Sequence, residues 1–517
     1  MIKLINPNSM SKKPVISVIV TVHNQIEFIH ETIGGFAQQD INVPYEIIAV
    51  CDNCTDGSDL AIKNSYPNVR IEKVEYKHPC VSRNHGIDLA KGDFICFFDG
   101  DDTPHSNYLS KLYEALQKNP DKNLAYGRFN YPGFGLEAAR LPACNYMEWT
   151  PSWLQYGPIN NTPMMIRREL IDKGARWEEN IRTREDYEFT HSLVKAGAKG
   201  VHVRDVIWDY RLHEGSIWGS NRAAALATHS MKFLQKKHNL NAPDLETMFI
   251  SILSRRDLFE EYFKNIAEID MPRNEMHYFV FIDSNDEELI KDAIERAEKL
   301  KFASLRVFVT NEESLVDEMS FYKRGMRIAR NVEICMNEAK KTHGGAKYVF
   351  MVEDDTKVPA DSYQKLKKHL DSNENLGYVS GCEVSRAESR HMGIAHLKGD
   401  EFGQVIHRIN PHPKKKGLEN ITSGGWYCWM GRVDAIVGQK YRCTNEENDE
   451  RMIGPDAYFV YDLHARGYDT QVDWSIWCDH YSSTDGWLTP NDAIMYEFEH
   501  LHRNDQWIRM MIKREKK

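Results

Sequence analysis

The sequence has no apolar run close to the ~18 residues that a membrane-spanning helix requires. Its longest apolar runs are stretches such as 15–22. Residues 1–14 are polar and lack the apolar segment of a secretory signal peptide. The ten cysteines are scattered, and Cys51 and Cys96 lie in apolar runs where a reduced thiol packs as a small hydrophobe. We therefore expect a cytoplasmic protein without a transmembrane segment.

The sequence has no excess of positive charge, since 66 Lys and Arg residues stand against 76 Asp and Glu and the formal net charge is −10. Broad nucleic-acid binding relies on neutralising phosphates and is therefore disfavoured. A basic run at 412–416 and a basic tail at 513–517 keep a local nucleic-acid contact open, although such runs are usually solvated loops. Cys51 and Cys54 form a CxxC, but without a second pair or a nearby histidine a zinc or redox site is disfavoured.

The remaining composition, 41% apolar and 27% charged, is that of a folded globular protein. The length indicates two or three domains. The first half alternates strand-like and helix-like segments, a βαβαβ order that predicts a doubly wound sheet with ligands at the carboxyl ends of its strands. The predicted strands are 15–22, 45–50, 69–76 and 93–98, and the predicted helices are 25–39 and 81–91.

A stretch from about 221 to 269 has few strand signals and no glycine, and we interpret it as helical, with a domain boundary near Met271 and Pro272. The second half then restarts the same order, with strands at 277–282, 305–309 and 348–352 and a helix at 323–341. We thus expect two α/β domains, joined by a helical segment and followed by a helical, basic tail. The expected bounds are 1–220, 221–270, 271–490 and 491–517.

The two halves also repeat their polar landmarks in the same order. In both halves, an Arg-Asn pair in a helix precedes a buried strand and an acidic group. Further on, an aspartate begins a helix that ends at a glycine. An Ile-Trp pair and a histidine follow this helix. The paired landmarks are Arg83 and Arg330, Asp99–Asp102 and Glu353–Asp355, Asp186 and Asp456, Ile207-Trp208 and Ile476-Trp477, and His213 and His480. Chance is a poor explanation for this whole series.

A strand that ends in Asp-x-Asp puts carboxylates in the ligand-binding crevice of a doubly wound sheet. Such hard oxygen ligands suit Mg²⁺ or Mn²⁺, which neutralises a diphosphate. Taken alone, the motif is a weak signal, because two aspartates after a strand are common in acidic surface turns. Its recurrence in a repeated context favours the metal-binding interpretation.

Asp186 and His213 each allow two interpretations. Asp186 opens a predicted helix and can be an N-terminal cap, or it can be a general base that accepts a proton from an attacking hydroxyl. His213 can be a partly buried histidine at a strand end, or a neutral imidazole that completes a metal shell. The surrounding pattern favours the catalytic alternatives.

Over about 14–218 these motifs, in this order and at these spacings, resemble the GT-A-fold glycosyltransferases of family 2. The matching segments are Ile16–Asn24, Val50–Ser58, Ser82–Asn84 with Gly86, Phe98–Asp102, Glu185-Asp186 and Tyr210–His213. Cys51 departs from the family pattern, which usually has a further aspartate there. This departure bears on nucleotide preference rather than on enzyme class.

The resemblance implies that Asp52 contacts the nucleotide base, that Asp99 lies near the ribose, and that Asp101 binds a metal on the diphosphate. Arg83 is included in the donor site. It further implies that Asp186 is the base and that His213 assists at the metal. Inversion at the anomeric carbon follows, with Mn²⁺ or Mg²⁺ stabilising the leaving nucleoside diphosphate.

The second half, about 275–481, resembles the same fold more distantly. There Glu353 and Asp355 occupy the acidic motif, with Asp355 as the metal ligand, and Arg330, Asp456 and His480 take the places of Arg83, Asp186 and His213. No aspartate matches Asp52 in this alignment, because the strand 307–309 is followed by Thr-Asn-Glu. Two aromatic segments, 423–429 and 146–156 with Trp149 and Trp153, can stack on sugars or pack in a core.

We therefore expect a metal-dependent glycosyltransferase that uses a UDP- or GDP-linked sugar and has two active domains. The acceptor class, whether glycan, lipid-linked or nucleic acid, is left open. The alternatives are one active domain with a degenerate acceptor-binding domain, a transferase acting on modified DNA bases, and a carbohydrate-binding protein without activity. A glycoside hydrolase is disfavoured, because the carboxylates lie at the ends of parallel strands in a nucleotide-binding type of fold.

Overall fold

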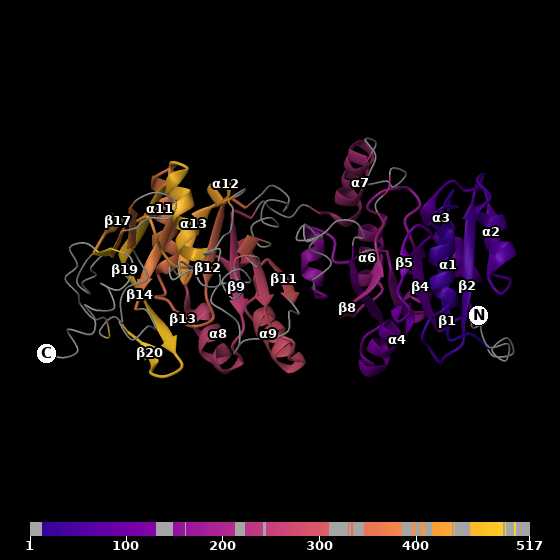
Figure 1. Cartoon of the computed structure of the whole chain (residues 1–517), viewed down its shortest axis with the longest axis horizontal. Coiled ribbons are helices and arrows are strands. Elements are labelled where there is room, and N and C mark those ends of the chain that lie inside the picture. The colour runs from indigo at the N-terminus through magenta and orange to yellow at the C-terminus, as the bar shows by residue number, and fades with distance from the viewer. Residues whose placement is uncertain are drawn as a thin grey trace. The chain divides into compact units, whose positions relative to one another are not determined.

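The structure is a computed structural model of the chain. It describes residues 13–130, 148–160, 162–211, 213, 223–240, 245–309, 329, 332–333, 346–384, 395–398, 405–408, 416–436, 439, 455–489, 492 and 501–502. The chain divides into two compact units, Met1–Ala242 and Pro243–Lys517. The first unit runs from indigo to magenta in Figure 1, and the second continues to yellow.

The described part of the first unit contains an eight-stranded sheet in the order β3-β2-β1-β4-β7-β6-β8-β5. Neighbours β1, β2, β3 and β4 are parallel. The apolar sequences of β1, β2 and β4 fit strands that are covered on both faces, whereas β3 is only partly buried. The strands predicted in this half are confirmed to within a few residues. These four are β1 (Ile16–Val22), β2 (Tyr45–Asp52), β3 (Arg70–Val74) and β4 (Phe94–Asp99), and the sheet also contains β5 (Thr103–Pro104), β6 (Leu124–Asn130), β7 (Met164–Arg167) and β8 (Gly200–Asp209), which were not predicted.

Helices cover this sheet and set the positions of its polar edge. Helix α3 (Pro79–Leu89) packs so closely on β1 that a Cβ on Gly86 would lie 2.4 Å from Ile19 Cγ2. Glycine is therefore required at this contact. The other helices are α1 (Ile29–Ala37), α2 (Ser58–Ser65), α4 (Tyr108–Lys118), α5 (Glu169–Asp172), α6 (Glu185–Lys195) and α7 (Ala223–His238), with a 3₁₀ turn η4 at Pro151–Gln155.

The second unit repeats the strand order of the first. The main path of its sheet is β11-β10-β9-β12-β18-β14-β19-β13, with the same parallel and antiparallel neighbours at equivalent places. The predicted fold class, two tandem Rossmann-like α/β units, is confirmed. The strands are β9 (Thr247–Leu253), β10 (Met276–Ile282), β11 (Ser304–Val309), β12 (Tyr348–Val352), β13 (Thr356–Lys357), β14 (Leu376–Glu383), β17 (Leu418–Asn420), β18 (Cys428–Arg432), β19 (Asp469–Ser482) and β20 (Gly486–Leu488).

Strand β9 corrects one sequence prediction. Residues 221–270 were expected to form a helical linker, but Thr247–Leu253 is a buried strand between β10 and β12, parallel to both. Hydrogen bonding on both sides outweighs any helical tendency of this short apolar run. In the sequence, helix α7 precedes this strand and α8 (Phe259–Glu268) follows it. The chain divides into its two units after Ala242 rather than near Met271.

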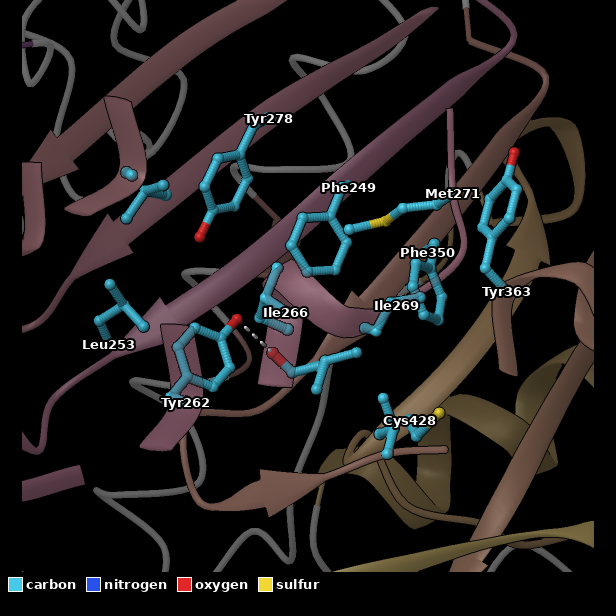
Figure 2. Close-up of a cluster of buried hydrophobic side chains, with 14 of the residues drawn as sticks. Phe249, Leu253, Tyr262, Ile266, Ile269, Met271, Tyr278, Phe350, Tyr363 and Cys428 are labelled. Carbon is cyan, nitrogen blue, oxygen red and sulfur yellow. Dashed lines mark hydrogen bonds between the residues drawn. The ribbon is translucent and has the colours of Figure 1, made fainter. Parts of the chain in front are cut away.

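The core of the second unit forms around β9. The ring of Phe249 stacks on Tyr278 with 5.0 Å between centroids and lies 5.4 Å from Phe350. Figure 2 shows this group together with Leu253 and with Tyr262 of α8. The hydroxyl of Tyr262 donates to the carbonyl of Val352, 3.3 Å away, so the core also fixes the end of β12.

The remaining elements lie mainly around the second sheet. The helices are α9 (Glu287–Lys299), α11 (Ser362–Ser372), α12 (Val433–Ile436) and α13 (Pro455–Ala465), with 3₁₀ turns η5 (Arg256–Leu258) and η6 (Arg273–Glu275). A separate sheet joins β15 (Ala395–Lys398), β16 (Val405–Arg408) and β21 (Leu501–His502). The expected helical tail is thus a strand at 501–502, and most of it lies outside the described residues. Among the described residues, no helix has the length and apolarity needed to cross a membrane.

Candidate functional site

The acidic motif of the first unit lies where β4 ends. Strands β1, β2 and β4 are parallel, so the residues that follow them meet at one edge of the sheet. Gly100 donates its N–H to the Thr21 carbonyl at 3.0 Å, and a Cβ at this position would lie 2.8 Å from that oxygen and 2.2 Å from Gln25 Oε1. The close approach needs glycine, and it presents Asp99 and Asp101 on either side of the turn.

Asp101 and His213 come together as predicted. His213 Nε2 lies 2.9 Å from Asp101 Oδ2. Arg211 holds the same turn, because its Nε donates to the Asp101 carbonyl at 2.9 Å and its backbone N–H donates to Asp102 Oδ1 at 2.9 Å. Burial and the Asp99 charge raise the pKa of Asp101, while His213 opposes the rise. A carboxylate and an imidazole at this edge are a plausible part of a metal shell.

Arg83, expected in the donor site, is instead a buried link between two carboxylates. Its side chain is 4% exposed. It donates to Asp99 Oδ1 at 2.7 Å and to Glu185 Oε1 at 3.3 Å, and its guanidinium lies 4.5 Å from the ring centroid of Trp177. Burial acts to lower the pKa of Arg83, but the two carboxylates raise it overall. Arg83 therefore fixes the acidic turn relative to helix α6, and a direct contact with the donor stays a prediction.

Asp186 lies in the first turn of α6, not at its cap. The N-cap residue is Arg184, whose φ of 56° is left-handed and whose side chain makes no capping bond. Asp186 Oδ1 accepts the N–H of Tyr187 at 2.7 Å. Burial and the neighbouring Glu185 charge raise the pKa of Asp186 to about 7. A carboxylate with such a pKa can accept a proton near neutral pH.

Asp52, predicted to contact the base, is buried at the end of β2 and anchors α3. Its carboxylate accepts the N–H groups of Lys77 at 2.7 Å and His78 at 2.9 Å, and the hydroxyl of Ser82 at 2.9 Å. These bonds satisfy donors at the start of the helix. The contact with a nucleobase stays a prediction.

The large aromatic side chains described in the two aromatic segments pack mainly in the core. Trp153, Trp426, Tyr427 and Trp429 are all buried. Trp149 is partly buried and lies against Gly200, where a Cβ would come within 2.4 Å of its ring. The core-packing alternative is therefore correct for these residues.

The second acidic group follows β12, and Asp354 and Asp355 differ in what they contact. Asp354 is buried, and its Oδ2 accepts the N–H groups of Ser254 at 2.6 Å and Arg255 at 3.0 Å. Burial and the Asp355 charge raise the pKa of Asp354 to about 6. Asp354 thus holds the loop after β9, which leaves Asp355 as the ligand candidate.

Asp355 and His480 also come together, but less closely than the pair in the first unit. His480 Nε2 lies 3.6 Å from Asp355 Oδ2, and Arg255 Nη1 lies 3.0 Å from the same oxygen. His480 Nδ1 faces Glu383 Oε1 at 3.1 Å. Arg255 and Glu383 were not predicted as site residues from the sequence, since neither belongs to a recognisable motif. Arg330 lies outside the described residues.

Asp456 occupies the first turn of α13 and is the counterpart of Asp186 on α6. Burial raises the pKa of Asp456 as well. Both predicted bases therefore lie at the start of an 11-residue helix in corresponding parts of the two units.

The strand registers reveal a counterpart of Asp52 that the sequence alignment missed. Leu253 pairs with Ile282 at the ends of β9 and β10, as Val22 pairs with Cys51 at the ends of β1 and β2. Asp283 therefore stands where Asp52 stands. The error arose because β9 was not recognised and β10 was taken for the first strand. The apolar run Thr247–Leu253 was the signal that could have prevented it.

Each acidic site offers two side chains to a cation. Within the described ranges, no group of three or more His, Cys, Asp or Glu side chains is arranged to hold a metal ion. A cation at Asp101 and His213 would need further oxygen ligands from a substrate or water, as the incomplete shell predicted from the sequence requires.

Residues 17–173 match the family model described as Glycosyl transferase family 2. TuaG of Bacillus subtilis, named for teichuronic acid biosynthesis, is 29% identical over 224 residues, which cover 42% of this chain and 86% of TuaG. ExoO of Rhizobium meliloti, a succinoglycan biosynthesis protein, is 26% identical over 228 residues, 41% of this chain and 65% of ExoO. The crystal structure of S. aureus TarS 1–349 with UDP-GlcNAc is 21% identical, with a TM-score of 0.34, and the match covers 39% of this chain and 59% of that one.

Proposed function

We propose that this chain is a glycosyltransferase whose first unit, which matches the family 2 model over residues 17–173, uses a divalent cation and inverts the transferred sugar. The donor is a nucleoside-diphosphate sugar, UDP- or GDP-linked. The observation that carries the proposal is that Arg83 pairs with both Asp99 and Glu185. These ion pairs bring the turn that holds the Asp101–His213 pair close to the first turn of α6, where Asp186 lies. Arg83 connects the acidic turn to α6 and so couples the donor side to the base.

The cation, Mn²⁺ or Mg²⁺, would be held by Asp101 and His213. When bound, it neutralises the charge that develops on the leaving diphosphate. Asp99 already forms an ion pair with Arg83, so Asp101 is the carboxylate of the motif that is more available to a cation. Arg211 keeps the turn in place through its bonds to Asp101 and Asp102.

Asp186 is the proposed general base. It would accept the proton of an acceptor hydroxyl as that oxygen attacks the anomeric carbon. The raised pKa of Asp186 supports this role, because a base that titrates near the working pH combines adequate basicity with sufficient ionised form. The acceptor itself, a glycan, a lipid-linked sugar or a nucleic acid, is to be identified by screening.

We further propose that the second unit is a second transferase. Asp283, Asp355, Asp456 and His480 stand in places that correspond to those of the first site. One observation favours the alternative of a degenerate acceptor-binding domain: Arg255 already pairs with Asp355. The two alternatives differ in whether Asp355 is needed for a transfer reaction.

Release of nucleoside diphosphate from a panel of sugar donors, with and without acceptors, tests both proposals. Asp101→Ala should abolish one transfer reaction and Asp355→Ala another, each leaving its counterpart intact. Asp205→Ala and Asp361→Ala, at exposed aspartates on β8 and next to α11, are the matched controls. Full activity after chelation of divalent cations would refute metal dependence. A folded Asp355→Ala chain with every transfer unchanged would make the second unit an acceptor platform.

A further inference from the structure

The histidine of the second acidic site is held on both sides by carboxylates. His480, Asp355 and Glu383 are 5%, 3% and 6% exposed. Glu383 ends β14, and His480 lies in β19, the neighbouring parallel strand. The imidazole therefore lies in a nearly solvent-free position between Glu383 and Asp355.

The contacts of His480 determine which ring nitrogen carries hydrogen. Nδ1 lies 3.1 Å from the Val384 carbonyl and 3.1 Å from Glu383 Oε1. A carbonyl oxygen only accepts hydrogen bonds, so Nδ1 must be a donor. In the neutral ring Nε2 then presents its lone pair.

Nε2 is directed at Asp355 without reaching hydrogen-bond distance. The separation from Asp355 Oδ2 is 3.6 Å, and Nε2 has no hydrogen-bond partner among the described residues. A buried nitrogen that faces a carboxylate without a hydrogen-bond partner is unfavourable unless a proton or a metal cation lies between the two groups. The orphaned nitrogen is thus an observation, independent of the acidic motif, that fits a metal ion.

The described residues of the first unit hold their histidine differently. His213 Nε2 is 2.9 Å from Asp101 Oδ2, so with Asp101 ionised Nε2 is the donor. His213 must transfer its hydrogen to Nδ1 before Nε2 can bind a cation. A neutral His480 with hydrogen on Nδ1 needs no such transfer, so the two histidines differ in which ring nitrogen the surrounding groups hold.

We propose that Glu383 is a positioning residue that holds His480 with Nε2 directed at a divalent cation bound to Asp355. The inference rests on the proposed function, in which the second unit binds such a cation. Carboxylates that accept from the second nitrogen of a ligating histidine fix its orientation and strengthen metal binding. The nitrogen ligand favours Mn²⁺ over Mg²⁺ or Ca²⁺, which prefer oxygen.

The test measures Mn²⁺ binding to the full chain by electron paramagnetic resonance. Asp101→Ala is present throughout to remove the first site. We expect one bound Mn²⁺ with a ¹⁴N coupling that disappears in His480→Gln. Adding Glu383→Gln should weaken binding about tenfold. Glu374→Gln, at an exposed glutamate after α11, is the control and should leave binding unchanged.

The possible outcomes separate the positioning role of Glu383 from the ligand role of His480 and from the proposed function of the second unit. Mn²⁺ affinity within twofold of the parent and an unchanged ¹⁴N coupling in a folded Glu383→Gln chain would refute the positioning role. If that variant unfolds, Glu383→Ala, which also removes the carboxylate, replaces it and should show the same loss of affinity; parental affinity would again refute the role. Bound Mn²⁺ without a ¹⁴N coupling in the parent would exclude His480 as a ligand. No bound Mn²⁺ in the parent would instead refute the proposed function of the second unit.

Discussion

Substitution of Glu185 by glutamine should shift the pH dependence of sugar transfer to lower pH. The pKa of Asp186 is raised from 3.8 to about 7, first by burial and second by the Glu185 charge. Glu185→Gln removes the second cause and retains the first. Arg83 keeps its shorter ion pair, to Asp99 at 2.7 Å, so the acidic turn should remain in place.

The size of the effect follows from the ionised fraction of the base. With a pKa of about 7, about half of Asp186 is ionised at pH 7, about a tenth at pH 6 and about a hundredth at pH 5. The parent kcat/KM should therefore fall about tenfold for each pH unit below 6. A pKa lowered by the loss of one neighbouring charge should move this acid limb down by roughly one pH unit.

The assay is kcat/KM for transfer between pH 5 and 8.5 at saturating Mn²⁺. Glu114→Gln, at an exposed glutamate of α4, is the control and should reproduce the parent profile. Asp186→Asn should abolish transfer while donor binding persists. An acid limb at the same pH in Glu185→Gln and the parent, or a parent profile flat from pH 5 to 8, would refute Asp186 as the titrating base.

Three further outcomes are expected. Arg83→Met leaves two carboxylates without their shared cation and should lower the free energy of unfolding of the first unit by about 3 kcal/mol in urea titrations; an unchanged midpoint would contradict the buried-link role. Gly100→Ala places a Cβ within 2.8 Å of the Thr21 carbonyl oxygen and should weaken Mn²⁺ binding to the first unit. Electron paramagnetic resonance measures this binding, and parental affinity would show that the turn tolerates a side chain. The side chain of Arg255 is 34% exposed, and its charged group lies 3.0 Å from Asp355 Oδ2. Arg255→Met removes this positive charge and should tighten Mn²⁺ binding to the second unit several-fold. Weaker binding would mean that the arginine supports the site.

The sequence alone determined the strands that carry the first site. Strands β1, β2 and β4 are buried on both faces, and such strands need uninterrupted apolar runs that are visible without any tertiary information. The acidic group after β4 and its repeat after β12 were also predictable. Residues that follow a buried parallel strand lie at the ligand-binding edge whatever the surrounding loops do.

Tertiary structure decided the identity of β9 and the partners of the site residues. A seven-residue apolar run such as Thr247–Leu253 does not distinguish helix from strand, and only pairing with β10 and β12 resolved it. Arg83 meets Glu185 across a long stretch of chain, and Arg255 meets Asp355 in the same way. Ion pairs of this kind leave no local pattern, because their geometry depends on how helices pack on the sheet. The sequence therefore identified which carboxylates border the sites, and the fold determined which of them are already neutralised.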